Sequence, residues 1–210
     1  MIVYVESNFV LEMALLQEEH KHCEAIMRLC GPSVNQLVIP VFSIAEPMET
    51  MTRRHRQREE LNKTLTTEIR QLARTESYQE QAGAVQEITS LIVRSMAEEQ
   101  SRLDDVLGRL LDCADTIPLN SAIFDSAAEY RVASGMSPQD SIVLASILHH
   151  LETVSPPSSC FLNKNSRDFA DPDIVAALES RNCKVLFKFS TGLDYLRSQP
   201  QAAEAPDEVE

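Results

Sequence analysis

Tryptophan is absent from this 210-residue chain, and glycine occurs only five times. Few glycines, together with many Ala, Leu, Glu, Gln and Arg residues, favour a helix-rich protein. No window approaches the roughly 18 uncharged apolar residues of a membrane span. The first residues also lack the basic and apolar regions of a signal peptide. We therefore expect a cytoplasmic protein without a membrane partner.

Positive charge is scarce as well, because 19 Lys and Arg residues stand against 32 Asp and Glu residues, giving a formal net charge of −13. Nucleic-acid binders are more often basic, so any contact with RNA or DNA has to be local. The five cysteines are scattered and form no Cys-x-x-Cys pair. This usage is typical of reduced, buried thiols.

Short apolar runs bounded by polar residues predict buried strands of a parallel sheet. The runs are residues 2–5, 37–42, 158–162 and 184–189, and residues 116–119 are either a short strand or a connector. Helical patterns lie between them, so the order is strand, helix, strand, helices, strand, helix. That order indicates an α/β three-layer sandwich with a parallel sheet of about five strands flanked by helices.

The helical patterns differ in length. Apolar residues recur at helical spacing from 9 to 30, where Gly31-Pro32 is a stop signal. Residues 48–113 are charged and nearly free of Gly and Pro, which predicts two to four helices, including Leu61–Leu72, Ala84–Glu98 and Leu103–Cys113. We expect one domain over 1–197, with an enlarged helical insertion at about 53–115 and a disordered acidic tail at 198–210.

Four acids share one kind of position along the chain. Glu6 and Asp168 follow predicted strands, whereas Glu46 and Asp140 open the helices behind Phe42 and Gly135. Strand ends that lead into helices lie at one edge of a parallel sheet, where α/β proteins bind ligands. Carboxylates gathered there repel one another unless a cation neutralises them, and Mg²⁺ or Mn²⁺ takes carboxylate oxygens. Such a pocket activates water against a phosphodiester bond.

A plainer interpretation exists for each of these groups. The spacings Ser43-x-x-Glu46 and Ser137-x-x-Asp140 both fit a capping box at a helix start, and Asp168 fits an Asx cap. A cluster of basic residues in the predicted insertion is open to two interpretations in the same way. It consists of Arg53, Arg54, Arg56 and Arg58. These arginines form either a solvated helix face balanced by nearby acids or a phosphate-binding patch.

The segments around the four acids resemble the PIN domain family, the nuclease fold of VapC-type toxins and of many RNA-processing enzymes. The matching segments are Val5-Glu6-Ser7-Asn8, Glu46 behind the second strand, Gln139-Asp140-Ser-Ile-Val-Leu-Ala145 and Phe161-Leu-Asn163-Lys-Asn165-Ser-Arg-Asp168-Phe169. Together they span nearly all of residues 1–197 in order. The sequence departs from the family pattern at Glu6, where Asp is usual, and at Asn163, where Thr is usual.

The resemblance implies a metal-dependent endoribonuclease, with RNA as substrate and Mg²⁺ or Mn²⁺ as cofactor. Its catalytic and metal-binding residues would be Glu6, Glu46, Asp140 and Asp168. Side chains that orient the ligands or the substrate would be Ser7, Asn8, Asn163 and Asn165. Arg53, Arg54, Arg56 and Arg58 would hold the RNA backbone. An antitoxin and a homodimer are further partners that the family implies. The alternative is a weak or inactive PIN-like module that acts in binding or regulation.

Overall fold

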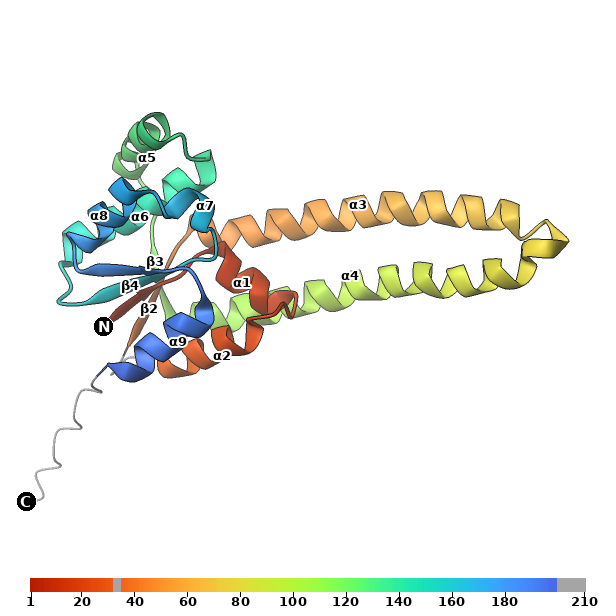
Figure 1. Cartoon of the computed structure of the whole chain (residues 1–210), viewed down its shortest axis with the longest axis horizontal. Coiled ribbons are helices and arrows are strands. Elements are labelled where there is room, and N and C mark those ends of the chain that lie inside the picture. The colour runs from red at the N-terminus through yellow and green to blue at the C-terminus, as the bar shows by residue number, and fades with distance from the viewer. Residues whose placement is uncertain (32–34, 200–210) are drawn as a thin grey trace, which may run out of the picture.

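A five-stranded sheet lies at the centre of the computed structural model, which describes residues 1–31 and 35–199. All neighbouring strands run parallel, in the order β3-β2-β1-β4-β5 (Figure 1). The strands are β1 (Ile2–Tyr4), β2 (Gln36–Pro40), β3 (Ala114–Ile117), β4 (Ser159–Leu162) and β5 (Cys183–Leu186). The predicted α/β fold with a parallel sheet of about five strands is therefore confirmed.

Helices make up most of the remaining described chain. They are α1 (Ser7–Ala14), α2 (His20–Leu29), α3 (Phe42–Leu72), α4 (Gln79–Cys113), α5 (Ser121–Ser134), α6 (Pro138–Val154), α7 (Ser166–Phe169), α8 (Pro172–Glu179) and α9 (Phe189–Ser198). A short 3₁₀ helix, η1 (Glu76–Tyr78), joins α3 to α4. No described helix is both long and apolar enough to cross a membrane.

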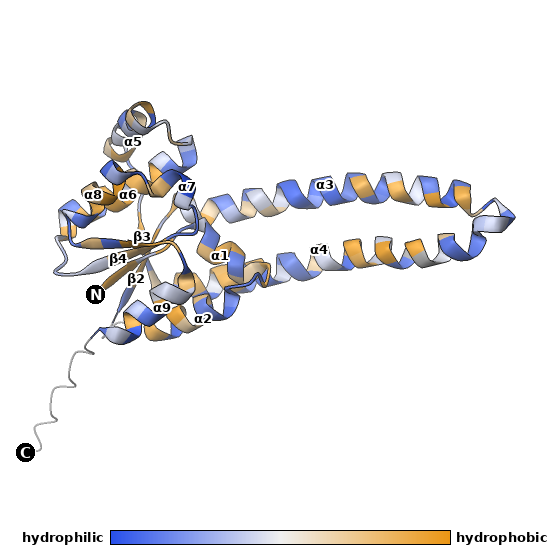
Figure 2. Cartoon of the chain, in the orientation of Figure 1, coloured by the Kyte–Doolittle hydropathy of each residue, from blue (hydrophilic) through white to orange (hydrophobic). Residues whose placement is uncertain are grey.

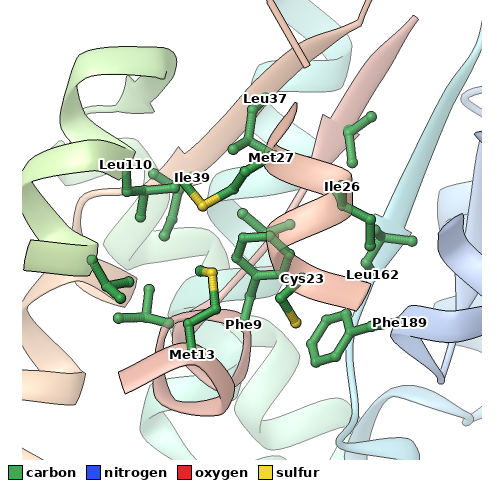
Figure 3. Close-up of a cluster of buried hydrophobic side chains, with 14 of the residues drawn as sticks. Phe9, Met13, Cys23, Ile26, Met27, Leu37, Ile39, Leu110, Leu162 and Phe189 are labelled. Atoms are coloured by element: carbon green, nitrogen blue, oxygen red, sulfur yellow. The ribbon is translucent and has the colours of Figure 1, made fainter. Parts of the chain in front are cut away.

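Two apolar clusters pack against the sheet because neighbouring side chains of a strand point to opposite faces. Val3 belongs to one cluster, whereas Ile2 and Tyr4 belong to the other. The first cluster receives side chains from α1, α2, α9 and the sheet-proximal part of α4 (Figure 3). The second receives side chains from α5, α6, α7 and α8. Four cysteines are buried, as expected, and Cys113 is exposed.

The helix predicted across residues 9–30 is two helices. The chain leaves the helical path after α1, where Leu16 adopts a left-handed φ of 51°. The carboxylate of Glu12 accepts a hydrogen bond from the backbone N–H of Glu19 at 2.9 Å, which holds the turn before α2. Residues 17–22 contain no apolar side chain, and Cys23 resumes the apolar spacing two turns after Leu16, so the sequence pattern was compatible with one helix.

The predicted insertion is a long helical hairpin that extends away from the sheet (Figure 1). The separate helices predicted at Ala84–Glu98 and Leu103–Cys113 are one continuous helix, α4, which is about 50 Å long at 1.5 Å per residue. Arg58 of α3 forms an ion pair with Glu99 of α4 at 2.7 Å and fixes the alignment of the two helices. Of the predicted acidic tail, residues 200–210 lie outside the described residues.

Candidate active site

Glu6 is both the N-terminal cap of α1 and a buried acid at the carboxyl edge of the sheet. Its Oε2 accepts a hydrogen bond from the backbone N–H of Asn8 at 3.1 Å, and the residue lies two positions after the end of β1. The residue is only 5% exposed. Its other oxygen, Oε1, is buried and has no hydrogen-bond partner among the described residues. One oxygen of this carboxylate therefore caps the helix, and the other is a buried acceptor that no described residue satisfies.

The hydroxyl group of Ser7 joins Glu6 to Glu46. Its oxygen lies 2.7 Å from Oε2 of Glu6 and 2.7 Å from Oε2 of Glu46. A hydroxyl carries a single hydrogen and can donate it to only one of the two oxygens. If both carboxylates were ionised, the Ser7 hydroxyl could donate to one of them only. The lone pairs of its oxygen would then face the lone pairs of the other carboxylate without a hydrogen between them. The pair therefore requires an additional proton or a cation at neutral pH.

The electrostatics of Glu6 agree with this requirement. The pKa of the Glu6 carboxyl is raised from 4.5 to about 7, chiefly by burial and to a smaller extent by the charge of Glu46, against the lowering effect of the hydrogen bonds from Ser7 and Asn8. A carboxyl with such a pKa holds a proton over part of the physiological range. It also exchanges that proton readily for a metal ion, because a cation stabilises the ionised form.

The capping box predicted for Ser43-x-x-Glu46 is wrong. Helix α3 begins at Phe42, its cap residue is Val41, and no side chain caps it. Ser43 therefore lies inside the first turn, where its hydroxyl is buried and has no hydrogen-bond partner in the described chain. Glu46 lies one turn into the helix and reaches Ser7 instead. The Glu46 carboxylate thus lies with Glu6 and Ser7 at the carboxyl edge of the sheet and does not cap the helix.

A second carboxylate pair lies at the start of α6 and in α7. The predicted cap at Ser137 is confirmed, because the Ser137 hydroxyl accepts from the backbone N–H of Asp140 at 3.0 Å. The Asp140 side chain does not complete a capping box, since its Oδ2 accepts from the same hydroxyl at 2.6 Å. The amide Nδ2 of Asn165 donates to Oδ1 of Asp140 at 3.2 Å and to Oδ2 of Asp168 at 2.7 Å. Burial, and then the charge of Asp168, raise the pKa of Asp140 against the Ser137 hydrogen bond.

Asn163 shapes the loop that carries this second pair. Its Oδ1 accepts a hydrogen bond from the backbone N–H of Asn165 at 2.6 Å, which forms an Asx turn directly after β4. Its Nδ2 is buried and has no partner among the described residues. The turn orients Asn165 between the two aspartates. Asp168 is not the Asx cap that its position suggested, since its carboxylate accepts from Asn165.

The structure thus places the four predicted acids in two separate pairs, Glu6 with Glu46 through Ser7 and Asp140 with Asp168 through Asn165. Within residues 1–31 and 35–199, no three or more His, Cys, Asp or Glu side chains are arranged to hold a metal ion in common. The donors present still suit a hard cation, because they are carboxylate oxygens and one of them, Oε1 of Glu6, is buried with no hydrogen-bond partner in the described part of the chain.

Lys164 is a further residue of this region that the sequence patterns did not indicate. It lies between Asn163 and Asn165 and forms an ion pair with the buried carboxylate of Glu12 in α1. Burial lowers the pKa of Lys164, but the hydrogen bond and the charge of Glu12 outweigh it and raise that pKa overall. The two partners are 152 positions apart in the sequence, so no local motif could have predicted the contact.

The arginine cluster in α3 is divided between two roles. Arg58 donates to Oε2 of the buried Glu99 at 2.7 Å and to the Ser95 hydroxyl at 3.3 Å, so it belongs to the interior of the hairpin. Arg53 and Arg56 are exposed, and Arg54 is partly buried. Within the described chain, none of these three takes part in an ion pair. They remain free to meet an anionic ligand.

Searches against protein-family models, characterised proteins and solved structures returned no match for this chain.

Proposed function

We propose that this chain is a metal-dependent nuclease of the PIN type that hydrolyses phosphodiester bonds in RNA. In this proposal the parallel sheet and its helices form the three-layer sandwich of that family, and the hairpin of α3 and α4 is an enlarged insertion. The supporting observation is the shared hydroxyl of Ser7, which lies 2.7 Å from both Glu6 and Glu46 at the carboxyl edge of the sheet. Two carboxylates on one hydroxyl favour either an additional proton or a bound cation, and the cation is the solution that supports a nuclease.

Mg²⁺ or Mn²⁺ would be that cation, held by Glu6 and Glu46, with Asp140 and Asp168 as the second carboxylate pair. When bound, such a cation activates a water molecule and stabilises the charge that develops on the phosphate oxygens. Glu6 suits the role of ligand because its cap contact with Asn8 fixes the carboxylate and no described residue bonds its Oε1. The carboxyl gives up its proton when the cation binds.

The other residues of the edge position these groups. Asn165 holds Asp140 and Asp168 at a fixed separation through one amide nitrogen, which reduces the movement that substrate binding has to suppress. Arg53 and Arg56 lie exposed on α3, the same helix that carries Glu46. Their guanidinium groups suit RNA phosphates. A few such contacts fit a chain whose net charge is −13, because binding is then local.

The decisive experiment is cleavage of an end-labelled mixed pool of single-stranded RNA, with and without Mn²⁺. We expect cleavage that requires the metal and is abolished in Asp140→Asn. The matched control is Asp125→Asn, since Asp125 is an exposed aspartate on α5 outside the edge. Equal cleavage by wild type and Asp140→Asn would assign the activity to a contaminant and refute the site.

A catalytically inactive binding module is the second candidate. The arrangement of the acids as two pairs, with no common group of three in the described residues, favours it. So does Glu6, whose side chain is one methylene longer than the aspartate usual in the family. The two candidates differ in one measurement: Mn²⁺ that raises the melting temperature of the wild type without any RNA cleavage would select the binding module. The family's antitoxin partner stays a prediction.

A further inference from the structure

A groove runs between α5 and α6, which pack against each other on one side of the sheet (Figure 1). Its volume is about 230 Å³. That volume is below the roughly 300–1,000 Å³ of pockets that enclose drug-sized ligands. The groove therefore suits a single flat ring system better than a bulky ligand.

The α5 side of the groove carries an aromatic ring and a guanidinium group on one helix face. Its lining residues are Phe124, Ala127, Ala128 and Arg131, which recur at the spacing of a single helical stripe. The two alanines have short side chains and leave room between Phe124 and Arg131, which lie about 10 Å apart along the helix. Phe124 is 51% exposed, and α5 carries both hydrophobic and hydrophilic residues in Figure 2. A ligand with an apolar part and an anionic part fits this face.

The α6 side adds apolar surface and few free polar groups. It consists of Pro138, Ser141 and Ile142. The Ser141 hydroxyl donates to the carbonyl oxygen of Pro138 at 2.9 Å, so its hydrogen is already used. Pro138 itself has no backbone N–H. These walls can contact the face of a ring, but they offer little hydrogen bonding to its edge.

Arg131 is available for an anion. It is exposed, and it takes part in no ion pair within the part of the chain that the structure describes. A guanidinium group binds phosphate oxygens through paired hydrogen bonds. An exposed aromatic ring such as that of Phe124 stacks on unpaired bases. A nucleotide combines these two chemical parts, a flat base and a phosphate.

The groove begins at the helix end that carries Asp140. Residues 135–137 join α5 to α6, so Arg131, in the last turn of α5, lies near the first turn of α6. Asp140 belongs to that same first turn, but it lies on the side of the helix that faces away from Pro138 and Ser141, about 10 Å across the helix. A single strand that crosses the start of α6 therefore reaches both the carboxylates and the groove.

We propose that this groove binds a base of single-stranded RNA near the scissile phosphate, with Phe124 stacked on the base and Arg131 holding a neighbouring phosphate. This role rests on the proposed function, and it involves a part of the substrate that the carboxylates do not contact. Stacking is open to every base, and the walls read no base edge. The groove therefore selects unpaired RNA over duplex without selecting a sequence. A long-chain carboxylic acid also has an apolar and an anionic part, but nothing connects it to the carboxylates of the site.

The absence of tryptophan makes the first test direct. Phe124→Trp keeps an aromatic ring in the groove and gives the protein one fluorescent indole. With Mg²⁺ present, we expect its fluorescence to be quenched by a hydrolysis-resistant, phosphorothioate-linked oligoadenylate and not by an abasic strand with the same backbone. Tyr78→Trp is the matched control, because Tyr78 lies in η1 and is also 51% exposed, and it should respond to neither strand. Equal quenching by both strands, no response to either, or a response to laurate instead of RNA would overturn the proposal.

The second test measures the affinity for the same two strands by fluorescence anisotropy of a dye on the strand. Phe124→Ala should weaken binding of the oligoadenylate about tenfold, as expected for one lost base stack, and should leave binding of the abasic strand unchanged. Arg131→Met should weaken binding of both strands, because its partner is the backbone. Tyr78→Ala and Arg197→Met, the latter at an exposed position of α9, should bind like the wild type. Wild-type affinity in Phe124→Ala would refute the stacking role.

Cleavage and binding together distinguish failure of the nuclease from failure of the groove. A wild type that does not cleave RNA, while Phe124→Trp still responds to the oligoadenylate, would refute the nuclease and leave the groove as an RNA-binding site. Metal-dependent cleavage by the wild type, with unchanged affinity in Phe124→Ala, would refute the groove and leave the nuclease.

Discussion

Lys164 forms an ion pair with Glu12 and so attaches the loop after β4 to α1. The Lys164 side chain is 35% exposed, whereas that of Glu12 is 2% exposed. The loop carries Asn163 and Asn165, and α1 begins at the residue that joins Glu6 to Glu46. The contact therefore connects the two halves of the carboxyl edge, each of which holds one carboxylate pair.

Replacing Lys164 by Met should destabilise the fold, because it leaves the Glu12 carboxylate buried without its cation. We expect a loss of about 2 kcal/mol in the free energy of unfolding, below the ~3–5 kcal/mol of a fully buried pair since the lysine is partly exposed. Urea unfolding of the wild type and Lys164→Met at pH 7 measures this loss in the free energy of unfolding. Lys21→Met, at an exposed position of α2 without an ion pair in the described chain, should change stability by less than about 0.5 kcal/mol. Equal effects of the two variants would contradict the role of the pair.

Glu6 should make the metal-free protein less stable as the pH rises. Because burial raises the pKa of Glu6 from 4.5 to about 7, the folded state between these values keeps a proton that the unfolded state has lost. Stability from this group is complete below pH 4.5 and falls by about 3 kcal/mol as the pH rises through 7. Unfolding at pH 5 and pH 8 in the presence of EDTA measures it.

Glu6→Gln is the variant that isolates this dependence, because the amide keeps an acceptor for the Asn8 N–H and has no charge to bury. We expect it to be more stable than the wild type at pH 8 and of similar stability at pH 5. It should also lose the stabilisation that Mn²⁺ gives the wild type. An unchanged difference between wild type and variant across this pH range would show that Glu6 does not titrate there.

Asn165→Ala should separate the two aspartates that the Asn165 amide joins. Without the shared donor, Asp140 and Asp168 repel each other directly, so we expect a lower melting temperature at pH 7 that Mn²⁺ largely restores. Ser166→Ala, at the next and exposed position, is the control and should melt like the wild type. A loss that Mn²⁺ does not restore would indicate that Asn165 only shapes the loop.

The arginines of α3 should fall into two classes. Arg58→Met should destabilise the hairpin, because Glu99 is then buried without its partner, and faster proteolysis between α3 and α4 measures this change.

Arg53→Met with Arg56→Met should leave stability unchanged and weaken RNA binding. The slope of the logarithm of the RNA-binding constant against the logarithm of salt concentration should then become shallower, by an amount that corresponds to the loss of about two phosphate contacts. Equal binding by this double variant and the wild type would remove both arginines from the substrate path.

Local sequence patterns predict much of the fold. Short apolar runs bounded by polar residues indicate the strands and place Glu6 and Asn163 at the carboxyl edge. The break at Leu16 depends on a left-handed turn and on the Glu12 contact with Glu19, and the polar residues 17–22 between the two helices fit an exposed helix face equally well. The long charged segment gave helical periodicity throughout, but it has no signal that separates one helix of 35 residues from several short ones.

The candidate site shows the same limit. The cap at Ser137 was recognised because a capping residue at a helix start is a local pattern, whereas Ser43-x-x-Glu46 misled because α3 begins one residue before Ser43. The contact of Glu46 with Ser7 depends on how β1 and β2 pair, which no local pattern encodes. Lys164 required knowledge of a partner 152 positions away.

Glu46 and the far end of the hairpin belong to the same uninterrupted helix, α3. From Glu46 to Leu72 the helix runs about 40 Å, so a tilt of about 5° at its base displaces the far end by roughly 3 Å. Pro47 directly follows Glu46 and lacks a backbone N–H, so the base of α3 is the place where such a tilt is accommodated. The first turn of α3, which carries Glu46, and a surface far from the sheet thus belong to one helix whose bending point lies beside the carboxylate.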